Sequence, residues 1–294
     1  MAIIRGQTRR RMNTFHTPVM LEEVLNALDV GEGKKYIDAT VGGGGHSIEI
    51  VKRGGKVLGI DQDPEAVEFV RQNFNWNIVQ GNFRDIEKIA QEHGFDKVDG
   101  ILFDLGVSSH QIDTPERGFS FRFPDAPLDL RMDPGQGMPV SEKIRHLSRE
   151  ELYEIFAKYG EEKLARSIAH AFVRSRGIRA ITKVGAVIEI VGSVVKGRTA
   201  RISTLARVFQ ALRILVNDEL AALKEGILGG GQLLTSGGRM VVLSYHSLED
   251  RIVKQAMMRS PLIPFIKKSA VASGEEITNN PRGRSAKLRV AKKI

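Results

Sequence analysis

The chain has 294 residues, of which 41% are hydrophobic and 27% are charged. This length and composition are typical of a globular protein with one large or two modest domains, and they exclude a disordered or fibrous chain. The 44 Lys and Arg against 35 Asp and Glu leave a net charge of +9, which favours an acidic partner such as nucleic acid. The chain has no cysteine, which excludes disulfides, cysteine-ligated zinc, iron–sulfur clusters and thiolate nucleophiles.

The sequence carries no sign of a membrane or secretory segment. No apolar run approaches the length of a membrane span. Residues 1–13 contain arginines at positions 5, 9, 10 and 11, without the apolar stretch that follows the charged start of a secretory signal. We therefore predict a cytoplasmic protein that contacts no membrane.

Short β-rich runs alternate with segments of helical length in the first third of the chain. Buried strands are predicted over residues 36–39, 56–60, 77–80 and 98–103, and this alternation predicts a parallel sheet. A residue able to touch a ligand stands near each strand end, at spacings of 23, 22 and 21 positions: Asp38, Asp61, Phe83 and Asp104. Any single Asp there could merely cap the next helix. Four in register favour a site, because ligands of open α/β sheets bind beyond the carboxyl ends of the strands.

The middle of the chain loses this alternation. Residues 114–137 are rich in Pro, Asp, Arg and Phe and predict an ordered loop, and residues 141–218 predict a helical insert. A strand over 239–245, a helix over 248–258 and a strand over 286–290 predict that the sheet resumes afterwards. Apolar residues recur every three or four positions from the last helix of the insert onwards, and predict one buried face: Ile202, Leu205, Phe209, Leu212, Val216, Leu220 and Leu223.

The most distinctive local pattern is the glycine-rich run Asp38-Ala-Thr-Val-Gly-Gly-Gly-Gly-His-Ser, between a predicted strand and a predicted helix. Glycine permits positive φ and close approach of a ligand, and the amides that open the next helix can hold a carboxylate or a phosphate. The run lacks the Lys-Ser/Thr ending of a nucleoside-triphosphate loop. It also lacks G-x-G-x-x-G spacing, which argues against nicotinamide, while a dinucleotide or phosphate loop remains an alternative.

The other strand ends suggest contacts with an adenosine-like ligand. Asp61 stands where a carboxylate accepts both hydroxyls of a ribose. Phe83 could pack on an adenine ring and Asp85 could bond its edge, although a lone aromatic is often part of the core. Asp104 opens a polar loop, Asp-Leu-Gly-Val-Ser-Ser-His-Gln, beside the expected reactive centre.

Nine segments together resemble the bacterial RsmH (MraW) family. They are His16-Thr-Pro-Val-Met, the Gly42 to Ser47 run, Gly59-Ile-Asp-Gln-Asp-Pro, Asp99-Gly-Ile-Leu-Phe-Asp-Leu-Gly-Val-Ser-Ser, Arg117-Gly-Phe-Ser-Phe, Pro127-Leu-Asp-Leu-Arg-Met-Asp, Asn217-Asp-Glu-Leu, Ser244-Tyr-His-Ser-Leu-Glu-Asp-Arg and Ser285-Ala-Lys-Leu-Arg. The resemblance runs nearly end to end. It implies an enzyme that transfers a methyl group from S-adenosylmethionine to N4 of a cytosine in 16S rRNA, in the decoding region of the small ribosomal subunit.

The resemblance also implies an α/β fold, a class I (Rossmann-like) methyltransferase sheet with an inserted all-helical domain. Residues 1–118 and 218–294 would form the methyltransferase domain, and residues 119–217 the insert, which we expect to recognise RNA. The residues it implies for binding S-adenosylmethionine are Gly44, Gly45, His46, Asp61, Phe83, Asp104 and Gln111. It further implies 16S rRNA within the assembled small subunit as the partner, and it is compatible with a homodimer. No metal site is predicted, because the seven His residues show no ligand spacing.

Methyl transfer to an amine depends mainly on placing the nucleophile in line behind the methyl carbon. An acceptor for an amine N–H would help to localise the nitrogen lone pair, and a proton must leave. The candidates to contact the amine or the ring edge are Asp104, Ser108, Asp129 and His246. Related amino-methyltransferases carry a Pro-Pro-aromatic sequence in the loop after the fourth strand. That sequence is missing here, so we assign base stacking to one of Phe119, Phe121 and Tyr245.

Positive charge is concentrated in the insert and the tail. Residues 166–213 contain ten Lys or Arg and one acid, and residues 279–294 contain six and none. Arg198 and Arg201, just before the striped helix, are expected to face RNA phosphates, and a solvated basic face is the alternative.

Three other functions remain open at this stage. The same cofactor pocket could methylate another RNA or DNA cytosine or a small molecule. A nicotinamide-dependent oxidoreductase is disfavoured by the contiguous glycines. A non-catalytic RNA-binding assembly factor would keep the fold without turnover.

Overall fold

The computed structural model describes residues 18–259, 261–266 and 268–294. The arginines of residues 1–13 and the first two residues of the His16 segment lie outside this range. The chain divides into two compact units, which we call the sheet unit (Met1–Ser109 and Leu220–Ile294) and the helical unit (His110–Glu219). Each is described by itself below.

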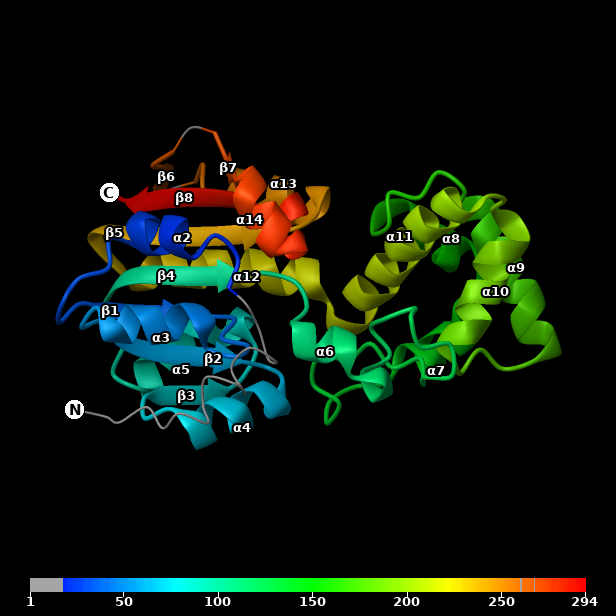
Figure 1. Ribbon diagram of the computed structural model, residues 1–294, viewed down its shortest axis with the longest axis horizontal. Helices are drawn as coiled ribbons and strands as arrows, with labels where there is room; N and C mark the ends of the chain where they lie inside the picture. The colour runs from blue at the N-terminus through cyan, green and yellow to red at the C-terminus, as the bar shows by residue number, and fades with distance from the viewer. Residues whose placement is uncertain (1–17, 260, 267) are drawn as a thin grey trace. The chain divides into compact units, whose positions relative to one another are not determined.

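The sheet unit contains one eight-stranded sheet with strand order β3-β2-β1-β4-β5-β8-β6, in which β7 also pairs with β8 (Figure 1). The strands are β1 (Lys35–Asp38), β2 (Lys56–Asp61), β3 (Asn77–Gln80), β4 (Val98–Asp104), β5 (Leu234–Ser244), β6 (Leu262–Pro264), β7 (Ala270–Val271) and β8 (Lys287–Lys293). The pairings among β1 to β5 are parallel, whereas β8 runs antiparallel to β5, β6 and β7. The predicted α/β class and all six predicted strands are confirmed, and β6 and β7 are additions.

Both faces of this sheet are buried, because alternate strand residues point to opposite sides. Ile37 and Ile101 pack in a core that includes residues of α5 (Ile86–Glu92), α12 (Glu219–Leu233) and α13 (Ser247–Ala256). Their neighbours Tyr36 and Leu102 pack on the other face with α2 (Leu21–Leu28) and α3 (Gly45–Lys52), which Figure 1 shows in front of the sheet. The remaining elements are α4 (Pro64–Asn73), α14 (Gly274–Asn279), and the short 3₁₀ helices η1 (Phe83–Asp85) and η3 (Pro281–Ser285).

The helical unit surrounds a single apolar core and confirms the predicted helical insert. Its elements are η2 (Pro115–Arg117), α7 (Val140–His146), α8 (Arg149–Lys158), α9 (Ala165–Ile178), α10 (Val184–Val194) and α11 (Arg198–Asn217), and the short α6 (Ser109–Asp113) spans the unit boundary. Local signals explain the helix starts. Ser148 caps α8 in a capping box with Glu151, for example. Within the described part of the chain, no helix is both long and apolar enough to cross a membrane.

The predicted apolar stripe is divided, which corrects the expectation of one continuous buried face. Asp218, in a left-handed conformation with φ 52°, ends α11, and a new helix starts at the next residue. Leu205 packs in the core of the helical unit, whereas Leu223 packs in the core of the sheet unit. Ile202 is 47% exposed in the first turn of α11. Periodicity could not detect the break, because a single left-handed residue leaves the apolar spacing unchanged.

The unit boundaries fall after Ser109 and Glu219, instead of after residues 118 and 217. The first boundary comes earlier because Arg117 belongs to the helical unit. Its guanidinium is buried and donates to the carbonyl of Met132 at 2.8 Å, and its carbonyl accepts from the amide of Leu130.

The predicted ordered loop, residues 114–137, is held by tertiary hydrogen bonds. The Asn217 side chain donates to the Leu130 carbonyl and accepts from the Met132 amide, both at 2.8 Å. Gly118 has φ +73°, and a Cβ at this position would lie 2.3 Å from the Pro127 carbonyl oxygen. The loop therefore depends on glycine at position 118.

Replacing Gly118 with Ala should lower the free energy of unfolding by about 3 kcal/mol or more, because left-handed strain and backbone overlap add. Urea unfolding of the whole protein measures this value. The control is Gly137→Ala, since Gly137 has φ +64° with open space around its missing Cβ. The control should cost only about 1 kcal/mol. Equal losses in the two variants would contradict the close packing at Gly118.

Candidate active site

The glycine-rich run forms the turn between β1 and α3. Gly42 and Gly44 have φ of +52° and +79°, and Gly44 caps the helix that begins at Gly45. The turn is closed by a hydrogen bond from the Gly44 amide to the Val41 carbonyl, 2.8 Å long. A Cβ on Gly42 would meet nothing within 4 Å, so a ligand can approach the backbone there.

Asp38 holds this turn from below. Its carboxylate, 1% exposed, accepts from the Ser47 hydroxyl at 2.6 Å and from the Thr40 amide at 3.2 Å. Burial raises the pKa of this carboxyl group, and the hydrogen bond from Ser47 partly opposes the rise. The Thr40 hydroxyl in turn accepts from the Asp104 amide at 2.6 Å. This chain of contacts ties the end of β1 to the end of β4.

Asp61, at the end of β2, meets the same turn. Its two carboxylate oxygens accept from the amides of Gly42, at 2.7 Å, and Asp63, at 2.9 Å. Burial raises its pKa to about 7, despite these two hydrogen bonds. An oxygen pair with lone pairs left over can accept ligand hydroxyls, as the sequence predicted for a ribose.

Phe83 is half-buried in η1, which follows β3. Its ring meets Phe103 edge to face, with centroids 5.6 Å apart, and it contacts α12 where a Cβ on Gly226 would lie 2.9 Å from the ring. Packing in the protein core therefore explains one side of the Phe83 ring. Asp85, in the same 3₁₀ turn, is exposed.

Asp104 ends β4 and is almost fully enclosed. Its side chain is 7% exposed, and its Oδ1 accepts from the Tyr245 hydroxyl at 2.7 Å. Its Oδ2 lies 3.7 Å from Nδ1 of His46, which is itself 4% exposed. The Tyr245 hydroxyl is thus bound to the Asp104 carboxylate. The sequence made Tyr245 one candidate for base stacking and did not suggest this hydrogen bond.

The loop after Asp104 is held by the C-terminal segment. Arg282 of η3 donates to the Ser109 hydroxyl at 2.7 Å and to the Val107 carbonyl. Ser108 lies between these two anchors and is partly buried. The sequence shows Arg282 only as part of the basic tail. No local signal links it to Ser109 and Val107, which lie 173 and 175 positions earlier in the chain.

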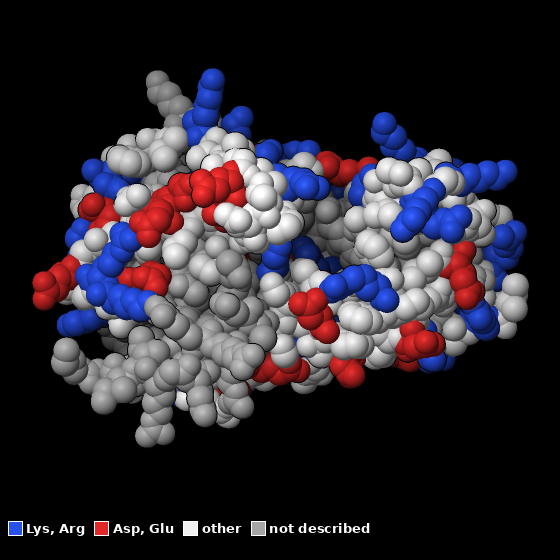
Figure 2. Space-filling model, in the orientation of Figure 1, with Lys and Arg blue, Asp and Glu red and all other residues white. Residues whose placement is uncertain are grey.

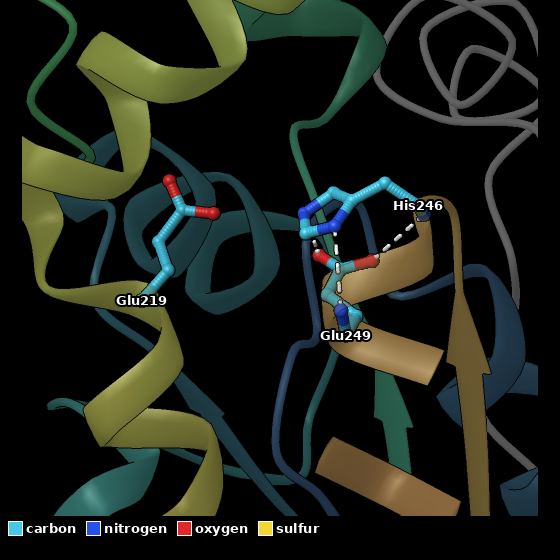
Figure 3. Close-up of side chains that lie close together, drawn as sticks. All are labelled: Glu219, His246 and Glu249. Carbon is cyan, nitrogen blue, oxygen red and sulfur yellow. Dashed lines mark hydrogen bonds and ion pairs between the residues drawn. The ribbon is translucent and has the colours of Figure 1, made fainter. Parts of the chain in front are cut away.

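His246 has a structural task. It is the N-cap of α13, where its Nδ1 accepts from the Glu249 amide at 3.3 Å and Glu249 reaches back to the backbone (Figure 3). Its Nε2 lies 3.1 Å from a Glu249 carboxylate oxygen. The contacts of this ring are those of a helix cap. The structure therefore gives His246 a capping role, which was the alternative to contact with a substrate.

The other predicted site residues belong to the helical unit. Asp129 makes a two-pronged ion pair with Arg131, at 2.7 and 2.8 Å, and Phe121 packs edge to face on Phe209 with centroids 5.9 Å apart. Phe119 lies 5.8 Å from the Arg117 guanidinium, and Gln111 is buried. Asp129 and Phe121 therefore have partners that explain them structurally.

The positive charge of the insert is only partly free. Five of the ten cations have acceptor partners within the unit. Arg176 donates to two backbone carbonyls, and the other four pair with acids: Arg179 with Glu189, Lys183 with Asp125, Arg207 with Glu162 and Arg213 with Glu219. Figure 2 shows Lys and Arg side chains on the face of the helical unit turned toward the viewer. We define the basic patch as four exposed cations without an acidic partner among the described residues: Arg174, Lys196, Arg198 and Arg201.

This strand order, with parallel strands β1 to β5 followed by an antiparallel β8, and a glycine-rich turn, Asp61 and Asp104 at the carboxyl edge, defines a class I methyltransferase fold. The MraW methylase family model matches residues 13–294, and the chain belongs to this family. The predicted family and fold class are confirmed.

Named relatives match almost the whole chain. The protein called Ribosomal RNA small subunit methyltransferase H of Bacteroides fragilis (strain YCH46) is 42% identical over 299 residues, which cover 95% of this chain and 98% of that protein. The protein of the same name of Thermomicrobium roseum is 44% identical over 310 residues, covering 96% and 95%. A solved structure, TrmN from Thermus thermophilus, is similar with a TM-score of 0.44 and 13% identity, over 94% of this chain and 48% of that one.

Proposed function

We propose that this protein transfers the methyl group of S-adenosylmethionine to the exocyclic N4 amine of a cytosine in 16S rRNA, in the decoding region of the small ribosomal subunit. The observation that carries the proposal is the meeting of the glycine-rich turn, Asp61 and Asp104 at one sheet edge in a member of a methylase family. The relatives named Ribosomal RNA small subunit methyltransferase H support RNA of the small subunit as the substrate.

The residues at this edge fit S-adenosylmethionine. The open space at Gly42 lets the backbone face a ligand, and Gly44 and Gly45 lead into the amides that open α3. Asp61 offers acceptors for ribose hydroxyls, and Phe83, a half-buried residue at the same edge, is the candidate to pack on an adenine. His46 is buried beneath Asp104, so it acts on that carboxylate, and Gln111 stays a candidate on the resemblance alone.

The chemistry that we infer follows from Asp104. S-adenosylmethionine supplies a methyl carbon that is already activated by its positively charged sulfur. The Asp104 carboxylate accepts a hydrogen bond from one N–H of the cytosine amine and thereby localises the nitrogen lone pair. The new N–C bond forms as the C–S bond breaks, with the bonding pair left on sulfur, and the amine proton passes to the carboxylate. Because the methyl group is activated in advance, in-line positioning contributes more than acid–base strength.

The helical unit is the proposed RNA-recognition domain. A cytosine must be unstacked to reach a pocket at the sheet edge, and cations must then hold the surrounding backbone. The basic patch supplies such cations, whereas Phe119 is the helical unit's remaining candidate for stacking, since Phe121 is engaged by Phe209.

Replacing Arg198 and Arg201 together with Gln should weaken RNA binding in every sequence context. Two phosphate contacts fewer should lower the slope of log affinity against log salt by about 2. The control is the double variant Arg145→Gln and Arg149→Gln, which loses the same charge in the same unit from cations already paired with Glu142 and Glu150. Filter binding at several salt concentrations measures both. An unchanged slope in the Arg198 and Arg201 variant would identify them as a solvated basic face.

The decisive experiment is transfer of tritiated methyl from S-adenosylmethionine to small subunits that lack this modification, followed by digestion and nucleoside identification. Label in N4-methylcytidine is the expected result. Label in another nucleoside, or in free RNA or DNA only, would show a methyltransferase with a different target. Cofactor binding without any label would favour an assembly factor.

A further inference from the structure

The hydroxyl of Tyr245 is fixed on Asp104. Tyr245 follows β5, whose residue Leu243 lies beside Asp104 in the parallel pairing. The Tyr245 amide donates to Glu249 Oε2 at 2.8 Å, which anchors its backbone, and its hydroxyl donates to Asp104 Oδ1 at 2.7 Å. The loop passes close to the ring, since a Cβ on Gly106 would lie 3.6 Å from it. The position of the ring is therefore set by contacts inside the sheet unit.

The second carboxylate oxygen of Asp104 faces an imidazole of defined orientation. His46 Nε2 lies 3.1 Å from the Val19 carbonyl, an acceptor, so this nitrogen carries the hydrogen. Its Nδ1 is then the atom directed at Asp104 Oδ2, 3.7 Å away. The Asp104 amide donates to the Thr40 hydroxyl, and the carboxylate lies between the Tyr245 hydroxyl and the His46 ring.

We propose that Tyr245 is a positioning residue for methyl transfer, and that it acts through its hydroxyl group by orienting Asp104 and keeping it ionised, instead of stacking on the target base. This rests on the proposed function, in which Asp104 contacts the amine. A hydrogen bond to the charged form of a carboxylate favours that form. The other oxygen of Asp104, Oδ2, lies on the side of His46, and we assign the amine proton to it.

The protonation of Tyr245 supports this role. Burial, together with the charge of Asp104, raises the pKa of Tyr245 well above its ordinary value, so the hydroxyl keeps its proton and remains a donor at every working pH. The charged or titratable groups around the pair come from several elements. They are His46 of α3, Asp38 of β1, Glu249 of α13 and Arg282 of η3.

The test is Tyr245→Phe, which keeps the ring and removes the hydroxyl. We expect kcat to fall about tenfold and the acidic limb of its pH dependence to move up by about one pH unit, since one hydrogen bond to the carboxylate is lost. Affinities for S-adenosylmethionine and for RNA should change less than about twofold. A role in stacking predicts the reverse, with Tyr245→Phe unaltered and Tyr245→Ala deficient in RNA binding, and that result would overturn the proposal.

A second readout needs neither cofactor nor turnover. A crystal structure of the cofactor-free Tyr245→Phe protein should show the Asp104 carboxylate turned from its wild-type orientation, because the hydrogen bond that fixes its Oδ1 is lost. The matched control is Tyr36→Phe. This change removes a buried hydroxyl that bonds Asp29 and Gly31, each at 3.0 Å, at the opposite end of β1. It should lower thermal stability only.

The two proposals fail in different ways. If the wild-type protein methylates no RNA, the proposed function is wrong, whatever the orientation of Asp104. If the wild type is active and both the Asp104 orientation and the pH dependence of kcat are the same in Tyr245→Phe, Tyr245 does not act on Asp104.

Discussion

Replacing Asp104 with Asn should reduce kcat for methyl transfer to small ribosomal subunits by about three orders of magnitude. The amide keeps an oxygen that accepts from Tyr245, so the site should stay folded, but it neither carries the charge that localises the amine lone pair nor takes up the proton. Single-turnover transfer of labelled methyl measures the chemical step, and calorimetry measures the affinity for S-adenosylmethionine. The affinity should change far less than the rate.

The matched control is Asp99→Asn, at the other end of the same strand. The Asp99 carboxylate accepts from the Lys35 amide at 2.9 Å, away from the carboxyl edge. This variant should transfer methyl groups at the wild-type rate. If Asp104→Asn kept more than a tenth of the wild-type kcat, Asp104 would be a structural acceptor only, and the search for the group that orients the amine would turn to Ser108.

The second large effect concerns Asp61 and the cofactor. Replacing Asp61 with Ala should raise the Kd for S-adenosylmethionine about 100-fold or more, because hydrogen bonds from both ribose hydroxyls to a charged acceptor are lost. The wild-type affinity should itself depend on pH. The ionised form of Asp61 accepts both hydroxyls, and its pKa is about 7, so Kd should rise as the pH falls below about 7. Calorimetric titrations between pH 5.5 and pH 8.5, a range spanning about 1.5 units on either side of this value, would show the midpoint.

The sign for stability is opposite to that for binding. The pKa of Asp61 is higher in the folded chain than the ordinary 3.8, so its contribution to folding is present below the ordinary value and is lost as the pH rises through about 7. In Asp63→Asn, the control, the N-cap of α4 is kept and a neighbouring negative charge is removed. The binding midpoint should then move slightly down in pH, with the affinity at high pH unchanged. A wild-type Kd that is constant across pH 7 would contradict ionisation of Asp61 as the binding requirement.

Local sequence patterns determined most of the sheet edge. The βα repeat places Asp38, Asp61, Phe83 and Asp104 one unit apart, and parallel strands bring their carboxyl ends to one edge. The glycines with positive φ were also detectable, because the requirement is local. The family resemblance then supplied the cofactor and the substrate class, which the physical pattern alone left open between several nucleotides.

Only the tertiary structure decided which side chains meet. Tyr245 reaches Asp104 across 141 residues of chain, and Asn217 reaches Leu130 across 87, and no periodicity encodes such pairs. The partners of Asp129 and His246, by contrast, are local, two and three residues along the chain, and a capping signal of this kind can be found in the sequence. A sequence therefore determines strands, turns and the edge where a ligand can bind, because these follow from backbone geometry within one βα unit. The orientation of a catalytic carboxylate depends on donors from other elements, and these are known only when the chain is folded.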